Sequence, residues 1–439
     1  MAPLISFYFQ VHQPYRLRDL RVDDIGQEDL SPFDDEKNRA VFRKVAEKCY
    51  LPANRLMLEL VKAYPNFRVS YSLSGVFLDQ CEEYGQDVLQ SFKDLAATGK
   101  VEFLAETYYH SLSYLRSLEE FGEQVKKHVN KIQELFGQTP SVFRNTELIY
   151  CNELAHVIRL LGFRGIIAEG ADHVLRGRSP NEPFAPPSFD LPTSVTDLLE
   201  KIRPLPAPAE RINILLKNYR LSDDVAFRFS DKSWVGFPLK SETFTDWLLG
   251  TGGHNVNLFM DYETFGEHQW ADTGIFDFLR DLPRIWQERG IVAATPTQVI
   301  DAWEHDHAQE FDAHGFISWA DMERDLSAWR GNKIQDAAFD AIYKMEHDVK
   351  SLGNAELLEI WRKLQTSDHF YYMCTKYWSD GDVHKYFSPY DTPYEAFRRF
   401  SHALVDLRTR VAAEKDKQLM PVKIEVEIEK PKRRFFFRD

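Results

Sequence analysis

The stretch NVNLFMDYE, residues 255–263, alternates between two kinds of side chain and decides the class of fold that the sequence predicts. One face is largely polar and carries Asn257, Phe259, Asp261 and Glu263. The opposite face is largely apolar and carries Val256, Leu258, Met260 and Tyr262. A strand buried on both faces of an open α/β sheet is apolar throughout, whereas a barrel strand turns one face to the helices and the other to the barrel interior. The stretch therefore predicts a barrel strand that ends in carboxylates.

Similar runs recur through about the first three hundred residues and alternate with amphipathic stretches such as 51–64 and 120–137. The candidate strands are residues 4–11, 67–73, 101–106, 141–147, 164–170, 212–218, 256–263 and 290–296. Strand and helix in turn imply parallel pairing, so an α/β fold is expected. The first run also has one polar face, which carries Ser6, Gln10 and His12, and this again favours a barrel over an open sheet.

The pattern changes to helices from about Trp303, with helical spacing in 335–352, 354–365 and 393–415. We therefore expect a catalytic barrel over 1–302 and a helical bundle over 303–415 that packs against it. The remaining residues, 416–439, combine an alternating stretch that predicts an edge strand, VKIEVEIEK, with a basic and aromatic tail, KPKRRFFFRD. We expect this tail to dock on the body of the protein.

One stretch differs from its surroundings, because eight prolines lie between Pro180 and Pro208. So many prolines predict that no regular element forms there. The stretch is either an ordered excursion over the surface or a loop over a cleft, and we favour the excursion.

Charge and composition narrow the partners. The chain has 54 Lys and Arg against 68 Asp and Glu, so its formal net charge is −14 and a nucleic-acid surface is not expected. Aromatic residues make up 14% of the chain and include nine tryptophans. Such a composition is typical either of a large aromatic core or of a cleft in which sugar faces stack on rings.

Location is predicted from the cysteines and from hydrophobicity. The four cysteines, Cys49, Cys81, Cys151 and Cys374, are far apart in the sequence and form no CxxC pair, which is typical of a reduced intracellular protein. The first residues read as a strand and not as a signal peptide. No apolar run is long enough to span a bilayer. We therefore expect a cytoplasmic protein without a membrane partner.

Carboxylates gather at the end of the 256–263 strand. Asp261 and Glu263 share a face, and Gly266, Glu267, His268 and Trp270 follow. Close carboxylates are costly to place together, and such clusters concentrate at active sites because they shift pKa values. By itself this segment is equally compatible with a solvated acidic loop.

A second carboxylate, Glu147, ends the candidate strand 141–147 and shares a face with Asn145. Glu147 could instead be an acid in the first turn of the following helix, where the helix dipole favours it. Taken with Asp261, it supplies a pair of carboxylates from different strands. Glycoside hydrolysis requires such a pair, because one carboxylate attacks or activates while the other donates and recovers a proton.

Histidines occupy other strand ends. His12 follows the first strand, and His110 follows Glu106 and Tyr108 after the strand 101–106. These residues could bind a metal ion. However, the sequence contains no HExxH, HxxxH or cysteine pair, so we do not expect a metal site.

Five ordered segments resemble the signature regions of glycoside hydrolase family 57. These are FYFQVHQP at 7–14, VEFLAETYYHSL at 101–112, FRNTELIY at 143–150, FMDYETFGEHQW at 259–270 and SWADMERDLSAWRGN at 318–332. The resemblance covers nearly the whole chain. It implies an incomplete (β/α)7 barrel followed by a C-terminal helical bundle, a retaining α-amylase type of activity on α-glucans, and no metal or other cofactor.

The resemblance also implies roles for individual residues. Glu147 would be the nucleophile and Asp261 the general acid/base. His12, His110, Glu263 and Trp329 would line the sugar subsites, and Glu106, Trp270 and Asp325 are further candidates for substrate binding. Among the tryptophans, Trp270, Trp319 and Trp329 are the candidate stacking platforms for sugar, and for Trp319 we favour the alternative that it packs in the core. We expect the charges of Glu263 and Glu147 to raise the pKa of Asp261 so that it holds a proton near neutrality.

Three functions remain open at this point. The first is an α-amylase-like hydrolase of α-1,4-glucans, and the second is a 4-α-glucanotransferase or branching enzyme that uses the same residues. The third is a weakly active, amylase-like glucan-binding protein. Outside this group, an α-mannosidase or a polysaccharide deacetylase on a related barrel would need a bound metal ion.

Overall fold

The computed structural model describes residues 2–303, 308–376 and 383–419, and its centre is a parallel β-sheet. Seven strands follow one another in the order β3-β2-β1-β8-β7-β5-β4. Their bounds are β1 Leu4–Val11, β2 Val69–Leu73, β3 Val101–Phe103, β4 Val142–Arg144, β5 Gly165–Glu169, β7 Asn213–Lys217 and β8 Asn255–Asp261. All six neighbouring pairs are parallel, as the alternation of strands and helices predicts.

The two ends of this sheet meet and close it into a barrel. Beyond the end of β3, Ala105 pairs in parallel with Phe143 of β4. The backbone N–H of Ala105 donates to the carbonyl of Val142 at 3.0 Å, and the N–H of Arg144 donates to the carbonyl of Ala105 at 2.8 Å. A barrel of seven strands, one fewer than the common eight, confirms the predicted incomplete (β/α)7 fold.

Alternation along each strand separates two cores. Outward side chains such as Phe7 and Phe9 pack with Tyr262, Phe265 and Trp286 beneath the helices. Inward side chains of the lower barrel form a smaller apolar cluster of Tyr8, Leu104, Ile167, Leu215 and Phe259. Polar inward side chains therefore gather above this apolar plug, towards the carboxyl ends of the strands.

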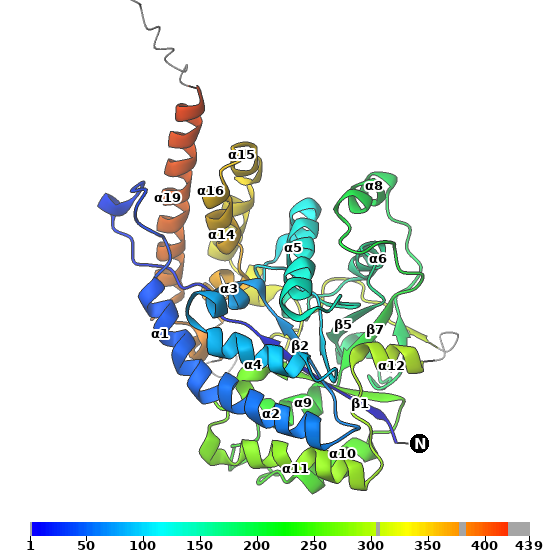
Figure 1. Cartoon of the computed structure of the whole chain (residues 1–439). Coiled ribbons are helices and arrows are strands. Elements are labelled where there is room, and N and C mark those ends of the chain that lie inside the picture. The colour runs from blue at the N-terminus through cyan, green and yellow to red at the C-terminus, as the bar shows by residue number, and fades with distance from the viewer. Residues whose placement is uncertain (1, 304–307, 377–382, 420–439) are drawn as a thin grey trace, which may run out of the picture.

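Helices cover the outside of the barrel, and Figure 1 shows α2, α4, α10 and α11 lying along one side of the strands. The helices that follow or flank the strands are α1 Asp35–Val45, α2 Leu51–Ala63, α3 Gly75–Tyr84, α4 Gln86–Ala96, α5 Leu118–Phe136, α6 Asn152–Leu160, α7 Asp172–Leu175, α9 Tyr219–Ala226, α10 Ser241–Gly250, α11 Ile275–Glu288 and α12 Pro296–Ala302. A π-helical turn, η2 Ala46–Tyr50, joins α1 to α2.

The strand predicted at 290–296 is absent from the described sheet. This segment makes a single parallel bridge, from Ala293 to Ile5 of β1. The chain then enters α12, which has Pro296 in its first turn and a capping box built by Thr295 and Gln298. A proline favours the first turn of a helix, so Thr295 and Pro296, which the apolar run placed in a strand, instead begin α12.

The proline-rich stretch does contain regular structure, contrary to the prediction. A short strand, β6 Phe184–Ala185, pairs with β7 and with β9 Gln309–Glu310, and a helix, α8, spans Thr193–Ile202. The prolines that flank α8 lie outside it, so they limit its length without interrupting it. A Cβ at Gly122 of α5 would lie 2.2 Å from Cδ1 of Ile202, so α8 packs closely on α5 at the surface.

The C-terminal part is helical, and Figure 1 shows α14, α15, α16 and α19 grouped on one side of the barrel. The bounds are α13 Ser327–Arg330, α14 Lys333–Tyr343, α15 Glu346–Ser351, α16 Ala355–Lys363, α17 Ser367–Tyr371, α18 Val383–Phe387 and α19 Pro393–Leu419. Their core also takes in Tyr15, Tyr108 and Ile149 from loops of the barrel. The helices therefore sit on the carboxyl end of the barrel, where the polar strand ends lie.

The edge strand predicted at 422–430 and the basic tail that we expect to dock on the body both lie outside the described residues. Within the parts that the structure describes, no helix is both long and apolar enough to cross a bilayer.

Candidate active site

A cavity of about 640 Å³ opens at the carboxyl end of the barrel. Strands contribute Gln10, Arg144, Lys217 and Asp261 to its lining, and the C-terminal segments contribute Trp319 and Asp368. Of the nine residues that the sequence singled out, five line it: His12, His110, Glu147, Asp261 and Glu263. The cavity therefore brings together strand ends that are up to about 250 residues apart in the sequence.

Glu147 has an unusual backbone conformation. It lies in a 3₁₀ turn, η4 Thr146–Leu148, with φ 61° and ψ 23°, and Leu148 also has a positive φ of 51°. A non-glycine residue in the left-handed region costs free energy and persists where the surrounding structure holds it, often at functional sites. The following helix, α6, begins only at Asn152, so Glu147 is not an acid of its first turn. That alternative is wrong.

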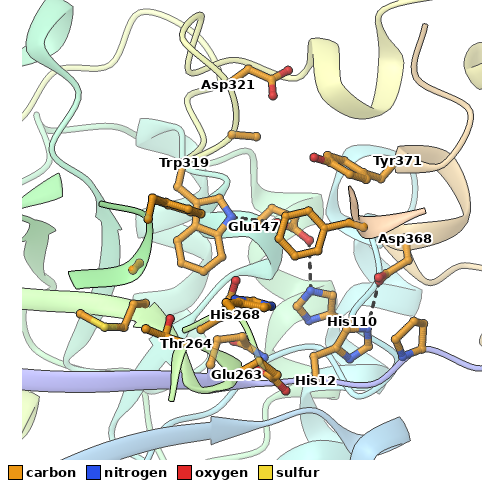
Figure 2. A pocket seen from close by; sticks show the side chains of 18 of the residues that line it. His12, His110, Glu147, Glu263, Thr264, His268, Trp319, Asp321, Asp368 and Tyr371 are labelled. Atoms are coloured by element: carbon orange, nitrogen blue, oxygen red, sulfur yellow. Dashed lines mark hydrogen bonds and ion pairs between the residues drawn. The ribbon is translucent and has the colours of Figure 1, made fainter. Parts of the chain in front are cut away.

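The carboxylate of Glu147 is held by donors on both oxygens, as Figure 2 shows from close by. His110 Nε2 lies 3.2 Å from Oε1, and the hydroxyl of Ser367 donates to the same oxygen at 3.1 Å. The indole N–H of Trp319 donates to Oε2 at 2.8 Å. Three donors on one carboxylate fix its orientation and stabilise its ionised form.

The surroundings of Glu147 lower its pKa. Burial acts in the opposite direction, but the hydrogen bond and the charge of His110, followed by the charge of Arg144, outweigh it. Glu147 is therefore a carboxylate anion at neutral pH, which is the state that a nucleophile needs.

His110 bridges two carboxylates. Its Nδ1 lies 3.0 Å from Oε2 of Glu106, and its Nε2 faces Glu147. Burial would lower the pKa of His110, but the hydrogen bonds to Glu106 and Glu147 raise it to about 9. The cationic ring therefore stands between the two anions and keeps each of them ionised.

Glu106 supports the site from behind. Its side chain is fully buried beside His110 and does not line the cavity. We expected Glu106 to bind substrate, and this position corrects that expectation. Although burial opposes the shift, the hydrogen bond and charge of His110 lower the pKa of Glu106 to about 2. Glu106 thus keeps His110 protonated and oriented.

Asp261 ends β8 and has the opposite electrostatic environment. Burial and the negative charge of Glu147 raise its pKa to about 6, against the lowering effect of Arg144, Lys217 and His110. The expected contribution of Glu147 is present, whereas Glu263 is not among the main causes. Asp261 can therefore hold a proton under mildly acidic conditions while Glu147 is ionised.

Glu263 is the more strongly shifted of the two neighbouring acids. Burial raises its pKa, and the charge of Asp261 adds to this, to about 8. The hydroxyl of Tyr50 donates to its Oε1 at 2.5 Å. Tyr50 is the last residue of the π-helical turn η2, and such turns are frequent at functional sites. The charge of Asp261 therefore raises the pKa of Glu263, whereas we expected the charge of Glu263 to raise the pKa of Asp261.

His12 lies flat against His110, with ring centroids 4.0 Å apart and an interplanar angle of 17°. Its Nδ1 lies 2.7 Å from the hydroxyl of Ser74, and its Nε2 lies 2.9 Å from Oδ2 of Asp368. Burial and the cationic His110 lower the pKa of His12. His12 is therefore neutral, and Asp368 and Ser74 occupy both of its ring nitrogens.

This stacking bears on metal binding. His12, His110 and Asp368 can each place one ligand atom within 4.8 Å of the others. A metal ion lies in the plane of each imidazole that binds it, along the nitrogen lone pair. Two nearly parallel rings 4.0 Å apart cannot both meet that condition, so their arrangement does not fit a shared metal ion.

Trp319 and Trp329 each lie where the sequence favoured placing the other, one in the cavity and one in the core. Trp319, expected in the core, lines the cavity and contacts Glu147. Trp329, expected to bind sugar, is 1% exposed and packs in the core of the C-terminal helices. This corrects its expected role, because a ring without accessible surface offers no face to a sugar.

Two other expected binding residues lie outside the lining. Trp270 is 60% exposed, with the ammonium of Lys48 5.4 Å from its ring centre. Asp325 accepts hydrogen bonds from the backbone and hydroxyl of Ser327 at 2.8 and 2.5 Å, at the start of α13. Asp325 therefore holds the turn that precedes α13, and its position does not support a sugar contact.

Several lining residues were not predicted. Lys217 ends β7 in the same way that Asp261 ends β8, so the rule that found Asp261 could have found it. Its ammonium lies 3.1 Å from Oδ1 of Asp223, which also lines the cavity. Asp368 and Tyr371 come from α17, where an ordinary helical pattern gives no indication of a site.

This fold and this pair of carboxylates define a class of enzyme. A parallel barrel with one ionised and one protonatable carboxylate facing the same cavity is the arrangement of a glycoside-cleaving enzyme. A sequence profile described as Glycosyl hydrolase family 57 matches residues 6–318. The chain belongs to this family.

A relative with a similar sequence supports the assignment to this family. A protein of Methanocaldococcus jannaschii named "Putative alpha-amylase" is 42% identical over 416 residues, which cover 92% of this chain and 84% of the relative.

Solved structures share the fold. A GH57-type branching enzyme of Pyrococcus horikoshii matches with a TM-score of 0.60 at 17% identity, over 88% of this chain and 87% of that one. A 4-alpha-glucanotransferase of Thermococcus litoralis also has a TM-score of 0.60, at 15% identity and over 84% of this chain. This chain spans 56% of the glucanotransferase.

Proposed function

We propose that the protein is a retaining glycosidase that acts on α-glucans, with α-amylase-like cleavage of α-1,4 linkages. The observation that carries the proposal is the opposite electrostatic environment of two carboxylates in one cavity. The pKa of Glu147 is lowered and that of Asp261 is raised to about 6. In retaining glycosidases one carboxylate must be an anion while its partner carries a proton.

In the first step, a carboxylate oxygen of Glu147 attacks the anomeric carbon as the glycosidic bond breaks. Asp261 transfers its proton to the departing glycosidic oxygen, which leaves as a hydroxyl on the released glucan. The remaining sugar is then bound covalently to Glu147, and Asp261 is ionised. The loss of negative charge on Glu147 also weakens the electrostatic effect that raised the pKa of Asp261.

In the second step, the ionised Asp261 takes a proton from water as the water oxygen attacks the anomeric carbon. The bond to Glu147 breaks, and its electron pair returns to the carboxylate. His110, Ser367 and Trp319 are positioned to donate to that carboxylate as its charge returns. Asp261 ends the cycle protonated.

Transfer to a sugar hydroxyl is the second candidate, as in a 4-α-glucanotransferase or a branching enzyme. Phe227 and Met322 line the cavity while 58% and 86% exposed, respectively. Exposed apolar groups at the mouth of a cavity would contact the faces of further sugar units, including those of an acceptor chain. The same two carboxylates would then pass the glucosyl group to sugar instead of water.

Incubation with maltoheptaose and analysis of product lengths distinguishes the candidates. Shorter products alone indicate hydrolysis, and products longer than the substrate indicate transfer. Tight binding without products would identify a weakly active glucan-binding protein and would refute the proposed activity. Glu147→Gln should abolish turnover in either enzyme, with Glu47→Gln at an exposed position as the matched control. Full activity of Glu147→Gln would refute the assignment of the nucleophile.

A cytoplasmic location belongs to the same proposal. The four cysteines are unpaired and buried, which supports a protein that works in a reducing compartment.

A further inference from the structure

The first turn of α17 lies directly on the candidate nucleophile. Ser367, its first residue, is fully buried, and its hydroxyl donates to Oε1 of Glu147 at 3.1 Å. A carboxylate can only accept, so the serine must be the donor in this pair. The helix belongs to the C-terminal part of the chain, beyond residues 6–318 that match the family profile.

Backbone pairing fixes the position of this turn. The N–H of Ser367 donates to the carbonyl of His110 at 2.9 Å, and Thr366 forms an antiparallel bridge with Ser111. The hydroxyl of Thr366 donates to the carbonyl of Tyr109, also at 2.9 Å. The two side chains that contact Oε1, those of His110 and Ser367, therefore come from segments that are hydrogen-bonded to each other.

The next residue along α17 anchors the turn a second time. Asp368 lies 2.9 Å from Nε2 of His12, and the ring of His12 is stacked on that of His110. Consecutive residues of one helix thus contact the nucleophile and the histidine pair beside it. Figure 2 shows Asp368 above His12 and Glu147 above His110, on the same side of the stacked rings.

We propose that Ser367 is a positioning residue for Glu147 and that α17 supplies it as part of the active site. This inference rests on the proposed function, because it takes Glu147 as the nucleophile. Two donors from paired segments hold Oε1, while Trp319 holds Oε2, so the carboxylate plane is fixed relative to the anomeric carbon.

Loss of the Ser367 hydroxyl should have two effects. The carboxylate would rotate more freely, which lowers the rate of attack. It would also lose a donor to its ionised form, which raises the pKa of Glu147. The charged groups that face this carboxylate are His110, Arg144, Asp261 and Asp368, and they remain in place.

The test compares Ser367→Ala with Ser367→Thr and Thr245→Val in the whole chain, with an aryl α-maltooligoside as substrate. We expect Ser367→Ala to lower kcat/KM by about tenfold, the effect of one hydrogen bond, mostly through kcat. The acidic limb of its pH profile should move to higher pH. Ser367→Thr should restore both quantities, because it keeps a hydroxyl at the same position.

Thr245→Val is the matched control, since it removes a buried hydroxyl from α10, a helix that contributes no residue to the lining of the cavity. It should leave kcat/KM and the pH profile close to those of the wild type. Wild-type kinetics in Ser367→Ala would overturn the inference. So would a loss in Ser367→Ala that Ser367→Thr does not restore and that leaves the acidic limb in place, because that result indicates a structural role.

Glu147→Ala separates this inference from the proposed function. If Glu147→Ala retains full turnover, the proposed nucleophile is wrong, whatever Ser367 does. If Glu147→Ala is inactive while Ser367→Ala behaves like the wild type, the proposed function stands and only the positioning role fails.

Discussion

Trp319 donates its indole N–H to Oε2 of Glu147 at 2.8 Å, and its backbone N–H donates to the carbonyl of the same residue at 3.2 Å. Side chain and backbone of one tryptophan therefore hold one glutamate. Because Trp319 also lines the cavity, a ring that can contact sugar is coupled to the carboxylate that would attack it.

Trp319→Phe should keep an aromatic ring in the cavity and remove the donor. A hydrogen bond to a charged group contributes roughly 1.5–3 kcal/mol, so kcat/KM should fall by about tenfold or more with little change in Tm. Steady-state kinetics on maltoheptaose and thermal unfolding measure the two quantities. Trp270→Phe, at an exposed position outside the cavity, is the control. Unchanged kcat/KM in Trp319→Phe would show that the indole N–H is dispensable.

Trp329→Ala should destabilise the protein, because the ring is 1% exposed within the core of the C-terminal helices. Truncation of a buried tryptophan costs roughly 3–5 kcal/mol of unfolding free energy. Denaturant unfolding measures this loss, and Trp270→Ala at the surface should change stability by no more than about 0.5 kcal/mol. Wild-type stability combined with weaker glucan binding would instead restore Trp329 to the sugar site.

Strand ends could be predicted from the sequence because their signals are local. A strand of period two assigns each residue to a face, so Asp261 could be placed at the carboxyl end of its strand before the fold was known. Glu147 and Glu263 lie in 3₁₀ turns just beyond the strand ends, where the alternation no longer applies. The same rule applies to Lys217, which ends β7. It fails for 290–296, where an apolar run leads into a helix start.

The residues that the C-terminal part contributes to the active site could not be predicted, because their positions depend on tertiary packing. Trp319 and Trp329 lie in the same motif, and the loop between them turns through left-handed residues at Asp321 and Arg324. The turns lie between Trp319, which lines the cavity, and Trp329, which packs in the core. Ser367 lies in an ordinary helical pattern, and pairing with the distant His110 segment gives it a place at the site.

Activity should depend on pH in a bell shape, with its maximum on the acidic side. Glu147 must be ionised, and its pKa is lowered, so the acidic limb should lie below the usual range for a glutamate. Asp261 must be protonated, and its pKa is about 6, so activity should fall as pH rises through that value. Initial rates across pH, with stability checked at each point, test this. An alkaline limb above about pH 8 would contradict the role of Asp261.

Stability should also depend on pH through Glu263. Its pKa is about 8 in the folded protein, well above the ordinary value of 4.5. A raised carboxyl pKa contributes stability below the unfolded-state value, and that contribution is lost as pH rises through the folded-state value. Wild-type stability should therefore decrease between about pH 5 and pH 8 more steeply than that of Glu263→Gln, which cannot ionise.

Denaturant unfolding at several pH values measures this difference, with Glu47→Gln at an exposed position as the control. The control should follow the wild-type dependence. Parallel curves for the wild type and Glu263→Gln would mean that Glu263 does not titrate with a raised pKa.

Phe227→Ala should affect long glucans more than short ones. Phe227 follows α9 at the mouth of the cavity and is 58% exposed, so its loss should leave the fold intact. Removal of a stacking face should raise KM for maltoheptaose by about threefold to tenfold, in line with roughly 0.5–1.5 kcal/mol for an aromatic contact. KM for maltotriose should change less if the short substrate does not extend to the mouth. Phe189→Ala, 39% exposed in wild type and outside the cavity, should leave both values unchanged. Equal increases in KM for both substrates would place Phe227 beside the cleaved bond instead of at a distal subsite.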